Sequence, residues 1–231
     1  MSLKNKKILI TAGPTWVPID DVRVISNIAS GETGILLAKQ AKKLGAKVTL
    51  FLGPVNGCCL ENGIKLIRFK YFEELRNKIK KELHSNKYDY IIHSAAISDF
   101  KPAESLKGKI SSKRAISLRL KPLPKIYVDI RRLAPQAKLV AFKLEPRVPD
   151  DVLIESAKLQ QYKAGAGFVV ANRINPYRAF IIDRSGNIVM VRSKKELANR
   201  LLKIIHLTPN TKHLIHVRNC RNHRCGWRLC L

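Results

Sequence analysis

The stretch of sequence that decides the fold is ILITAGPTWVPIDDVRVISNIASGETG, residues 8–34. It opens with a short apolar run that is typical of a buried strand. It closes with Ser30-Gly31-Glu32-Thr33-Gly34, which precedes an apolar-periodic helix. The start of such a helix offers unpaired N–H groups and the positive end of the helix dipole, and glycines let a ligand approach the backbone closely. The stretch therefore predicts a phosphate-binding unit of an α/β protein.

The separation between this strand and its helix is unusual. An ordinary dinucleotide-binding fingerprint has only a tight glycine turn at this point. Here a long polar segment lies between them and carries Asp20, Arg23 and Asn27. We interpret this segment as a sign that chemistry, and not only cofactor binding, takes place at this edge of the sheet.

Length and composition indicate one globular domain. A chain of 231 residues with 45% apolar residues is long enough for a large α/β domain with a full core. It contains no apolar run of about 18 residues, which a membrane-spanning helix would need. The first apolar run is too short for a secretion signal. We therefore expect a soluble, cytoplasmic protein with no membrane partner.

The charge is strongly positive. Lysine and arginine total 44 against 17 acidic residues, which gives a formal net charge of +27. The excess extends along the whole chain, so it suits polyanionic ligands and attracts nucleic acid without specificity. Solvated lysine-rich faces explain the same excess without any ligand. A dedicated nucleic-acid-binding protein would carry basic patches rich in aromatic residues, whereas aromatic residues make up only 6% here and are scattered.

The five cysteines do not form a recognisable framework. Cys58 and Cys59 are adjacent and cannot readily bridge each other, and an odd count without a signal peptide fits a reducing compartment. The other three lie in a basic tail, residues 208–231, at a spacing that is not standard for zinc. We expect this tail to be poorly ordered and to hold no metal; its Cys and His residues include His216, Cys220, His223, Cys225 and Cys230.

Strand and helix patterns alternate along the chain. This alternation predicts an α/β, Rossmann-like three-layer fold with a mostly parallel sheet and an antiparallel edge hairpin. Residues 99–114 are polar and basic, and we expect them to form a long functional loop. The expected strands are 7–11, 46–52, 88–95, 116–120, 138–142, 168–171, 179–183 and 188–192, and the expected helices are 31–44, 72–83, 124–133, 150–162 and 193–205.

Six segments resemble, in the right order, the phosphopantothenate–cysteine ligase family, also called phosphopantothenoylcysteine synthetase. The resemblance covers about residues 7 to 206. The segments are ITAGPT (10–15) with PIDDVRVISN (18–27) and SGETG (30–34), GAKVTLFLGPV (45–55), SAAISDFKPAE (94–104), LRLKPLPKI (118–126), VAFKLE (140–145) and AKLQQYKAGAGFVVAN (157–172).

The resemblance implies a two-step ligation in coenzyme A biosynthesis. The carboxylate of 4′-phosphopantothenate attacks the α-phosphate of a nucleoside triphosphate, releases pyrophosphate and forms an acyl-nucleotide. The amine of L-cysteine then displaces the nucleoside monophosphate. CTP, which gives an acyl-cytidylate, is expected in bacterial members and ATP in most eukaryotic ones, with Mg²⁺ in either case.

The resemblance also implies an organisation. Residues 1–207 would form a stand-alone ligase domain, without the flavin-dependent decarboxylase domain of the common bacterial fusion. The enzyme would be a homodimer with residues 99–121 near the partner subunit, and no specific nucleic-acid partner is expected.

Site residues carry over from the same motifs. Asn27 and Lys109 would be catalytic: Asn27 contacts phosphopantothenate and the acyl-nucleotide, and Lys109 stabilises the charge that develops on the acyl-phosphate. Asn27, Ala95, Ala96 and Asp99 would bind the substrate. The implied nucleotide-binding residues are Gly13, Ser30, Gly31, Gly34, Ser94, Ala95, Asp99, Lys109, Pro124, Lys125, Ile126, Phe142, Lys158, Lys163 and Asn172.

Each residue also has a plainer interpretation. Asn27 fits a turn, Asp99 an exposed loop, and Lys109 a generally lysine-rich segment. Phe142 fits the core, and the lysines near 160 fit a solvated helix face. The family pattern is also broken at Trp16-Val17, Ser111-Ser112 and Gly167, and the spacing from Lys158 to Lys163 is one residue longer than in bacterial fusions.

The main alternative is a short-chain NAD(P)-dependent reductase, which is another Rossmann enzyme. That class needs a compact glycine turn directly after the first strand and a Tyr-x-x-x-Lys pair on a helix. In this sequence Gly31 comes too late, and no tyrosine is followed by lysine at that spacing.

Overall fold

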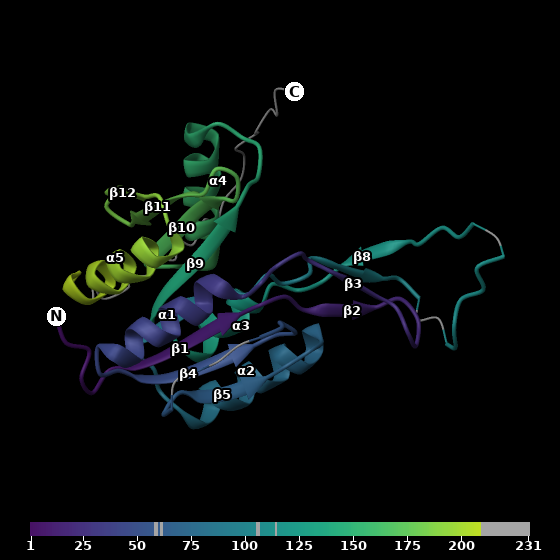
Figure 1. The fold of residues 1–231 in the computed structure, drawn as a ribbon, viewed down its shortest axis with the longest axis horizontal. Coiled ribbons are helices and arrows are strands. Elements are labelled where there is room, and N and C mark those ends of the chain that lie inside the picture. Colours follow the sequence, from purple (N-terminus) through teal and green to yellow (C-terminus); the bar gives the residue numbers. More distant parts are fainter. Residues whose placement is uncertain (58–59, 61, 105–106, 114, 209–231) are drawn as a thin grey trace, which may run out of the picture.

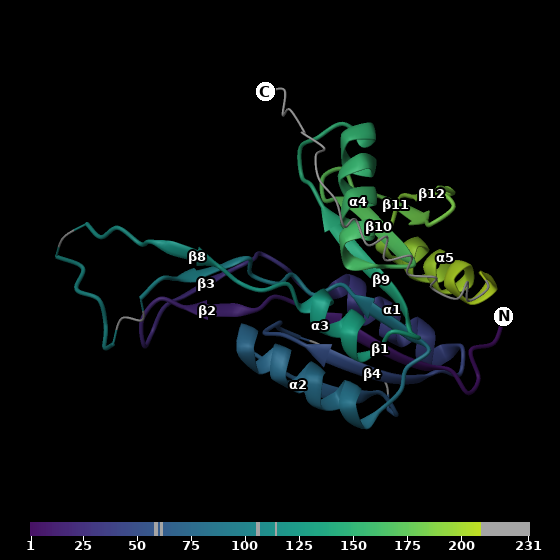
Figure 2. The ribbon, with the colours of Figure 1, turned by 180° about the vertical axis from the view of Figure 1, so that it is seen from behind.

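The computed structural model describes residues 1–57, 60, 62–104, 107–113 and 115–208. The expectations for the tail beyond Thr208, and for Cys58 and Cys59, concern residues outside these ranges. The described residues form a body built on one central sheet and an arm that projects from it, which Figures 1 and 2 show from opposite sides.

Eight strands form the central sheet. Neighbouring strands pair in parallel from β10 across to β5, whereas β11 pairs antiparallel with both β10 and β12. The expected mostly parallel sheet with an antiparallel edge hairpin is therefore confirmed. In spatial order the strands are β12 (Ile188–Val191), β11 (Arg178–Asp183), β10 (Phe168–Arg173), β9 (Lys138–Leu144), β6 (Tyr90–His93), β1 (Lys7–Ala12), β4 (Lys47–Leu52) and β5 (Lys65–Arg68).

Helices cover both faces of the sheet, which gives the expected three layers (Figure 1). Successive side chains of a strand point to opposite faces, so Ile10 joins one apolar cluster and Leu9 the other. The first cluster includes side chains of α1 (Glu32–Lys43) and α5 (Lys194–Leu207). The second includes side chains of α2 (Phe72–Ser85), α3 (Ile126–Leu133) and α4 (Asp150–Ala164). None of these described helices has the length and apolar character needed to cross a membrane.

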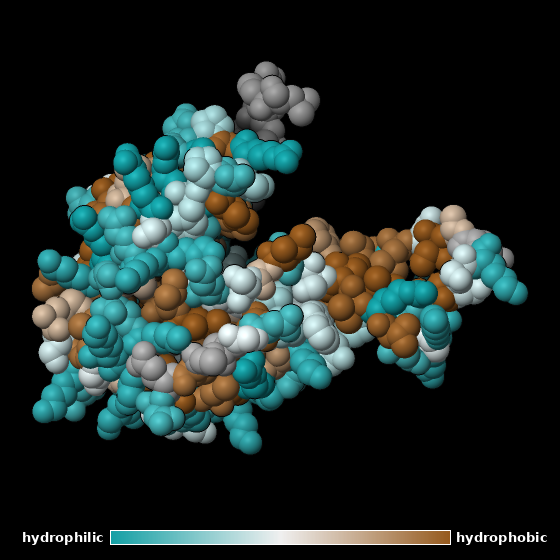
Figure 3. All heavy atoms as spheres, viewed as in Figure 1, coloured by the Kyte–Doolittle hydropathy of each residue, from teal (hydrophilic) through white to brown (hydrophobic). Residues whose placement is uncertain are grey.

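The arm consists of two short antiparallel strand pairs. Strands β2 (Trp16–Pro18) and β3 (Val24–Ser26) form one pair, and β7 (Phe100–Pro102) and β8 (Leu120–Pro122) form the other. Apolar side chains gather on the surface of the arm (Figure 3). The most exposed of these are Val22, Phe100, Ile116 and Leu120, with exposed fractions of 64%, 53%, 55% and 43%.

Asp20 holds the two halves of the arm together. Its carboxylate accepts the N–H of Ile110 at 3.0 Å, the N–H groups of Val22 and Arg23 at 2.9 and 2.7 Å, and the Arg23 guanidinium at 2.7 Å. Burial alone would raise the pKa of Asp20, but these hydrogen bonds and the charge of Arg23 lower it to about 2. Asp20 is therefore ionised at neutral pH and fixes residues 108–110 beside residues 20–23.

The secondary structure predicted from the sequence was wrong mainly in the arm. No strand was expected in the polar segment after β1, but it contains β2 and β3. The exposed strand expected at 116–120 begins only at Leu120, and the loop expected at 99–114 begins with β7. β5, the parallel edge strand, was not expected at all, because its sequence KLIR is short and half basic.

Candidate functional site

A pocket of about 1030 Å³ opens at the carboxyl ends of the parallel strands. After β1 the chain adds β4 and β5 on one side of that strand, and it then crosses to the other side to add β6 and β9. The pocket lies at this change in the order of the strands. Open α/β sheets bind ligands at this switch point. Residues at the base of the arm and residues of α4 both line the pocket, and Figure 3 shows the surface hollowed between these two parts.

Glycines bring the start of α1 close to the ends of β1 and β6. Gly13 and Gly31 have φ angles of 79° and 71°, which favour glycine. A Cβ atom on Gly34 would lie 2.4 Å from Cβ of Ala12 and 2.9 Å from Oγ of Ser94. The N–H of Glu32 donates to Oγ of Ser30 at 3.3 Å. The next two N–H groups of α1, those of Thr33 and Gly34, have no partner among the described residues, and both residues line the pocket, where such groups favour an anion.

Asn27 joins the base of the arm to the loop that follows β6. Its Nδ2 donates to the carbonyl oxygens of Ala96 at 3.2 Å and Ile97 at 3.1 Å. The same segments are held by Ser98, which donates its N–H to Oγ1 of Thr15 at 2.9 Å. Both amide protons of Asn27 are used in this way. Among the described residues its Oδ1 has no partner, so this oxygen is left to accept a hydrogen bond from a ligand.

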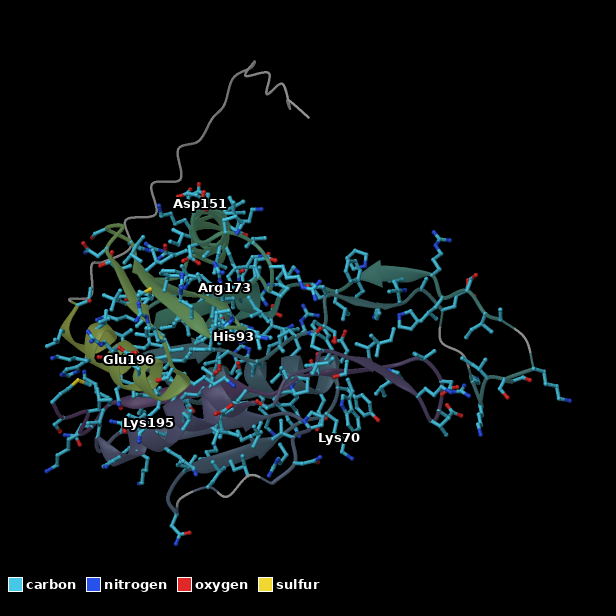
Figure 4. The ribbon with its side chains drawn as sticks, turned by 45° about the horizontal axis from the view of Figure 1, so that its top comes forward. Lys70, His93, Asp151, Arg173, Lys195 and Glu196 are labelled. Atoms are coloured by element: carbon cyan, nitrogen blue, oxygen red, sulfur yellow. The ribbon has the colours of Figure 1, made fainter. Side chains whose placement is uncertain are left out.

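His93 is a buried, neutral side chain in the floor of the pocket. Its Nδ1 lies 2.9 Å from Oγ1 of Thr11, which also accepts the N–H of Ala95. Because a hydroxyl can both donate and accept, this hydrogen bond forms in either neutral tautomer of the ring. Burial lowers the pKa of His93 to about 4, which keeps the ring neutral at pH 7. Figure 4 shows His93 inside the body.

An exposed ion pair lies at another side of the pocket. Nζ of Lys125 is 2.5 Å from a carboxylate oxygen of Asp99, and both side chains are at least half exposed. Pro124 and Ile126, which flank Lys125 at the start of α3, also line the pocket. Exposed pairs of this kind contribute little to stability, so Lys125 can exchange Asp99 for a ligand anion at little cost.

The remaining wall comes from β9, β10 and α4. Phe142 and Asn172 lie at the carboxyl ends of β9 and β10 and line the pocket. Gln160 of α4 donates Nε2 to the carbonyl oxygen of Phe142 at 2.9 Å. Lys163 lines the pocket one turn further along, whereas Lys158 pairs with Glu155 at 2.8 Å and does not line it.

The structure thus brings together every implied substrate- and nucleotide-binding residue except Lys109 and Lys158. Lys109 lies in the arm, between Gly108, which bonds to Asp21, and Ile110, which bonds to Asp20. It is therefore separated from the pocket of its own chain.

Sequence reasoning missed several polar residues that line the pocket, among them His93, Gln160, Tyr177 and Lys194. His93 could have been predicted, because it ends a buried strand directly before Ser94 and Ala95. Tyr177 and Lys194 gave no such signal, because only the packing of α5 and of the segment before β11 brings them to the pocket.

These features define a class of protein: a Rossmann-like α/β protein with a nucleotide-sized pocket at the switch point and an asparagine fixed at its edge. The family model described as "DNA/pantothenate metabolism flavoprotein C-terminal domain" matches residues 3–207. The chain belongs to this family.

Its relatives are consistent with this assignment. The "Coenzyme A biosynthesis bifunctional protein CoaBC" of Thermococcus kodakarensis is 35% identical over 87% of this chain and 51% of its own length. The protein of the same name from Borreliella burgdorferi is 34% identical over 88% of this chain and 53% of its own length. The chain therefore spans about half the length of these relatives.

A solved structure shows the same fold. The "DNA/Pantothenate Metabolism Flavoprotein" of Streptococcus pneumoniae superposes with a TM-score of 0.78, at 25% identity, over 87% of this chain and 98% of that one. The overall fold of this chain therefore recurs in that structure.

Proposed function

We propose that this chain ligates 4′-phosphopantothenate to L-cysteine and forms phosphopantothenoylcysteine. A carboxylate oxygen of phosphopantothenate attacks the α-phosphorus of CTP or ATP, and the bond to pyrophosphate breaks. The cysteine nitrogen then attacks the acyl carbon, loses a proton and expels the nucleoside monophosphate. Family membership supports this reaction, because the relatives named above carry coenzyme A biosynthesis in their names.

The observation that carries the proposal is the position of Asn27. Its amide is anchored to Ala96 and Ile97, so Oδ1 has a defined place at the edge of the same pocket that holds the start of α1. An acceptor there can bind a hydroxyl of the pantoyl group while the helix start binds phosphate. This arrangement holds an acyl group beside an α-phosphate, which is the geometry that the first step needs.

Magnesium fits the site as a companion of the nucleotide. Among the described residues, no group of three or more His, Cys, Asp or Glu side chains is placed to hold a metal ion. Mg²⁺ is commonly bound by one or two carboxylates together with substrate phosphates. We therefore place Mg²⁺ on the triphosphate, where it would neutralise charge, and leave positioning to the protein.

We also infer that the ligase works as a homodimer. The arm carries exposed apolar side chains, including Val22, Phe100 and Ile116, of the kind that protein interfaces cover. It also carries Lys109 away from the pocket of its own chain. A partner subunit that receives the arm would cover the apolar residues and gain the lysine.

The reaction is tested by pyrophosphate release. Purified protein is expected to release pyrophosphate from CTP, or from ATP, only when phosphopantothenate is present. A panel of CTP, ATP, GTP and UTP identifies the nucleotide. Pyrophosphate release that is independent of phosphopantothenate, or no release with any of the four nucleotides, would contradict the ligase proposal.

A further inference from the structure

One buried hydroxyl beside the pocket has no partner. Tyr177 lines the pocket from the segment before β11, and its hydroxyl oxygen is buried without a hydrogen bond to any described residue. Buried polar groups in proteins are nearly always hydrogen-bonded, and an exception needs an explanation. By contrast, Tyr88, another partly buried tyrosine, donates to Glu82 at 2.6 Å. The Tyr177 hydroxyl is therefore an unsatisfied hydrogen-bond donor.

An ion pair lines the same pocket as this hydroxyl. Glu32, the first residue of α1, pairs with Lys194, the first residue of α5, and both line the pocket. Lys195 and Glu196, labelled in Figure 4, mark the same end of α5. Burial, and then the charge of Glu32, raise the pKa of Tyr177 to about 12. The hydroxyl consequently keeps its proton at neutral pH, and Glu32 lines the same pocket.

Glu32 occupies the place that suits an anion. A negative group is favoured in the first turn of a helix, and here Glu32 also pairs with a cation, Lys194, while Tyr177 lines the same pocket. The pair is weak, however, because the side chains of Lys194 and Glu32 are 34% and 53% exposed. A phosphate group carries more charge and more acceptor oxygens than a carboxylate, so it can displace Glu32 from Lys194.

We propose that Tyr177 and Lys194 bind phosphate oxygens of the nucleoside triphosphate, and that Glu32 is the internal anion which the phosphates replace. This inference rests on the proposed function, because it assigns further ligand contacts to the same pocket. A tyrosine hydroxyl with its proton and an ammonium group together offer donors, which match an acceptor-rich phosphate better than a ribose or a base. The start of α1 adds further N–H donors to the same group.

The first test removes only the hydroxyl. Tyr177→Phe is expected to weaken the binding of inorganic tripolyphosphate, and of the triphosphate selected in the pyrophosphate assay, by about tenfold, since one hydrogen bond to a charged group is lost. Calorimetric titration measures both. The melting temperature without ligand is expected to stay equal or rise, because no hydrogen bond is broken. Tyr162→Phe, at a tyrosine that is 86% exposed and outside the pocket, is the matched control and is expected to behave like wild type.

The second test changes the internal anion. Glu32→Gln is expected to tighten the binding of tripolyphosphate by about threefold, because the competitor for Lys194 loses its charge, and Lys194→Met is expected to weaken it. Unchanged tripolyphosphate binding in Tyr177→Phe, or weaker binding in Glu32→Gln, would overturn the inference. If wild type releases pyrophosphate in the presence of phosphopantothenate but the variants do not show these changes in binding, the assignment of Tyr177 and Lys194 is wrong and the ligase proposal stands. If the variants behave as expected but phosphopantothenate-dependent release is absent, the phosphate contacts stand and the ligase proposal is lost.

Discussion

A Lys109→Gln variant is expected to fold normally and to lose about 100-fold or more in kcat, because removing one group that stabilises developing charge commonly has an effect of that size. Its fold is expected to survive, since the Lys109 side chain makes no hydrogen bond or ion pair with any other described residue. Lys109 does not line the pocket of its own chain. A loss of activity would therefore mean that it acts in the pocket of a partner subunit.

Mixed dimers show which pocket it is. If Lys109 serves the partner subunit, a dimer of one Lys109→Gln chain and one Asn27→Asp chain has one pocket with both defects and one intact pocket. Random pairing of equal amounts makes half of the dimers mixed, so about a quarter of wild-type activity is expected to return. Co-expression with two different affinity tags, followed by rate measurement, tests this. A mixture no more active than the two variants measured separately would show that Lys109 does not act across the dimer.

An Asn27→Asp variant is expected to lose about 100-fold or more in turnover, for a different reason. The two amide protons now bond to the carbonyl oxygens of Ala96 and Ile97 at 3.2 and 3.1 Å. A carboxylate oxygen in that place cannot donate and meets two acceptors, so both the loop after β6 and the side chain itself are displaced. Asn27→Ala is expected to lose activity as well, because it removes the acceptor oxygen.

A matched control separates this effect from added charge. Asn77→Asp places the same new carboxylate on an exposed position of α2, which does not line the pocket. It is expected to keep wild-type kcat and KM, while Asn27→Asp loses kcat without a large change in melting temperature, since Asn27 is exposed. Wild-type rates in Asn27→Asp would refute the assignment of Asn27 to the chemistry.

Much of the body could be predicted from sequence, because its elements are decided by local patterns. The buried run of β1, the apolar periodicity of α1 and the helix expected at 193–205 are all readable without tertiary information, and each lies close to where it was expected. The family motif implied Gly34 as a nucleotide-binding residue, and a Cβ atom there would lie only 2.4 Å from Cβ of Ala12, which shows why no larger residue fits.

The rest depended on contacts between distant segments. β2 and β3 each have only three residues, too few to show an alternating strand pattern, and they are held by Asp20, whose partner Ile110 is 90 positions away. Lys158 and Lys163 look equivalent in sequence, yet only Lys163 lines the pocket, because the two point to different sides of α4. Tyr177 and Lys194 become part of the site only through the packing of the sheet edge and α5.

The central claim is that the pocket joins a carboxylate to the α-phosphorus of a nucleotide before cysteine reacts. The most direct measurement uses phosphopantothenate with ¹⁸O in both carboxylate oxygens, together with the accepted triphosphate and cysteine, and follows the label by mass spectrometry. One ¹⁸O atom is expected in the phosphate of the nucleoside monophosphate and the other in the new amide. Unlabelled nucleoside monophosphate, or label in inorganic phosphate with release of a nucleoside diphosphate, would contradict the account.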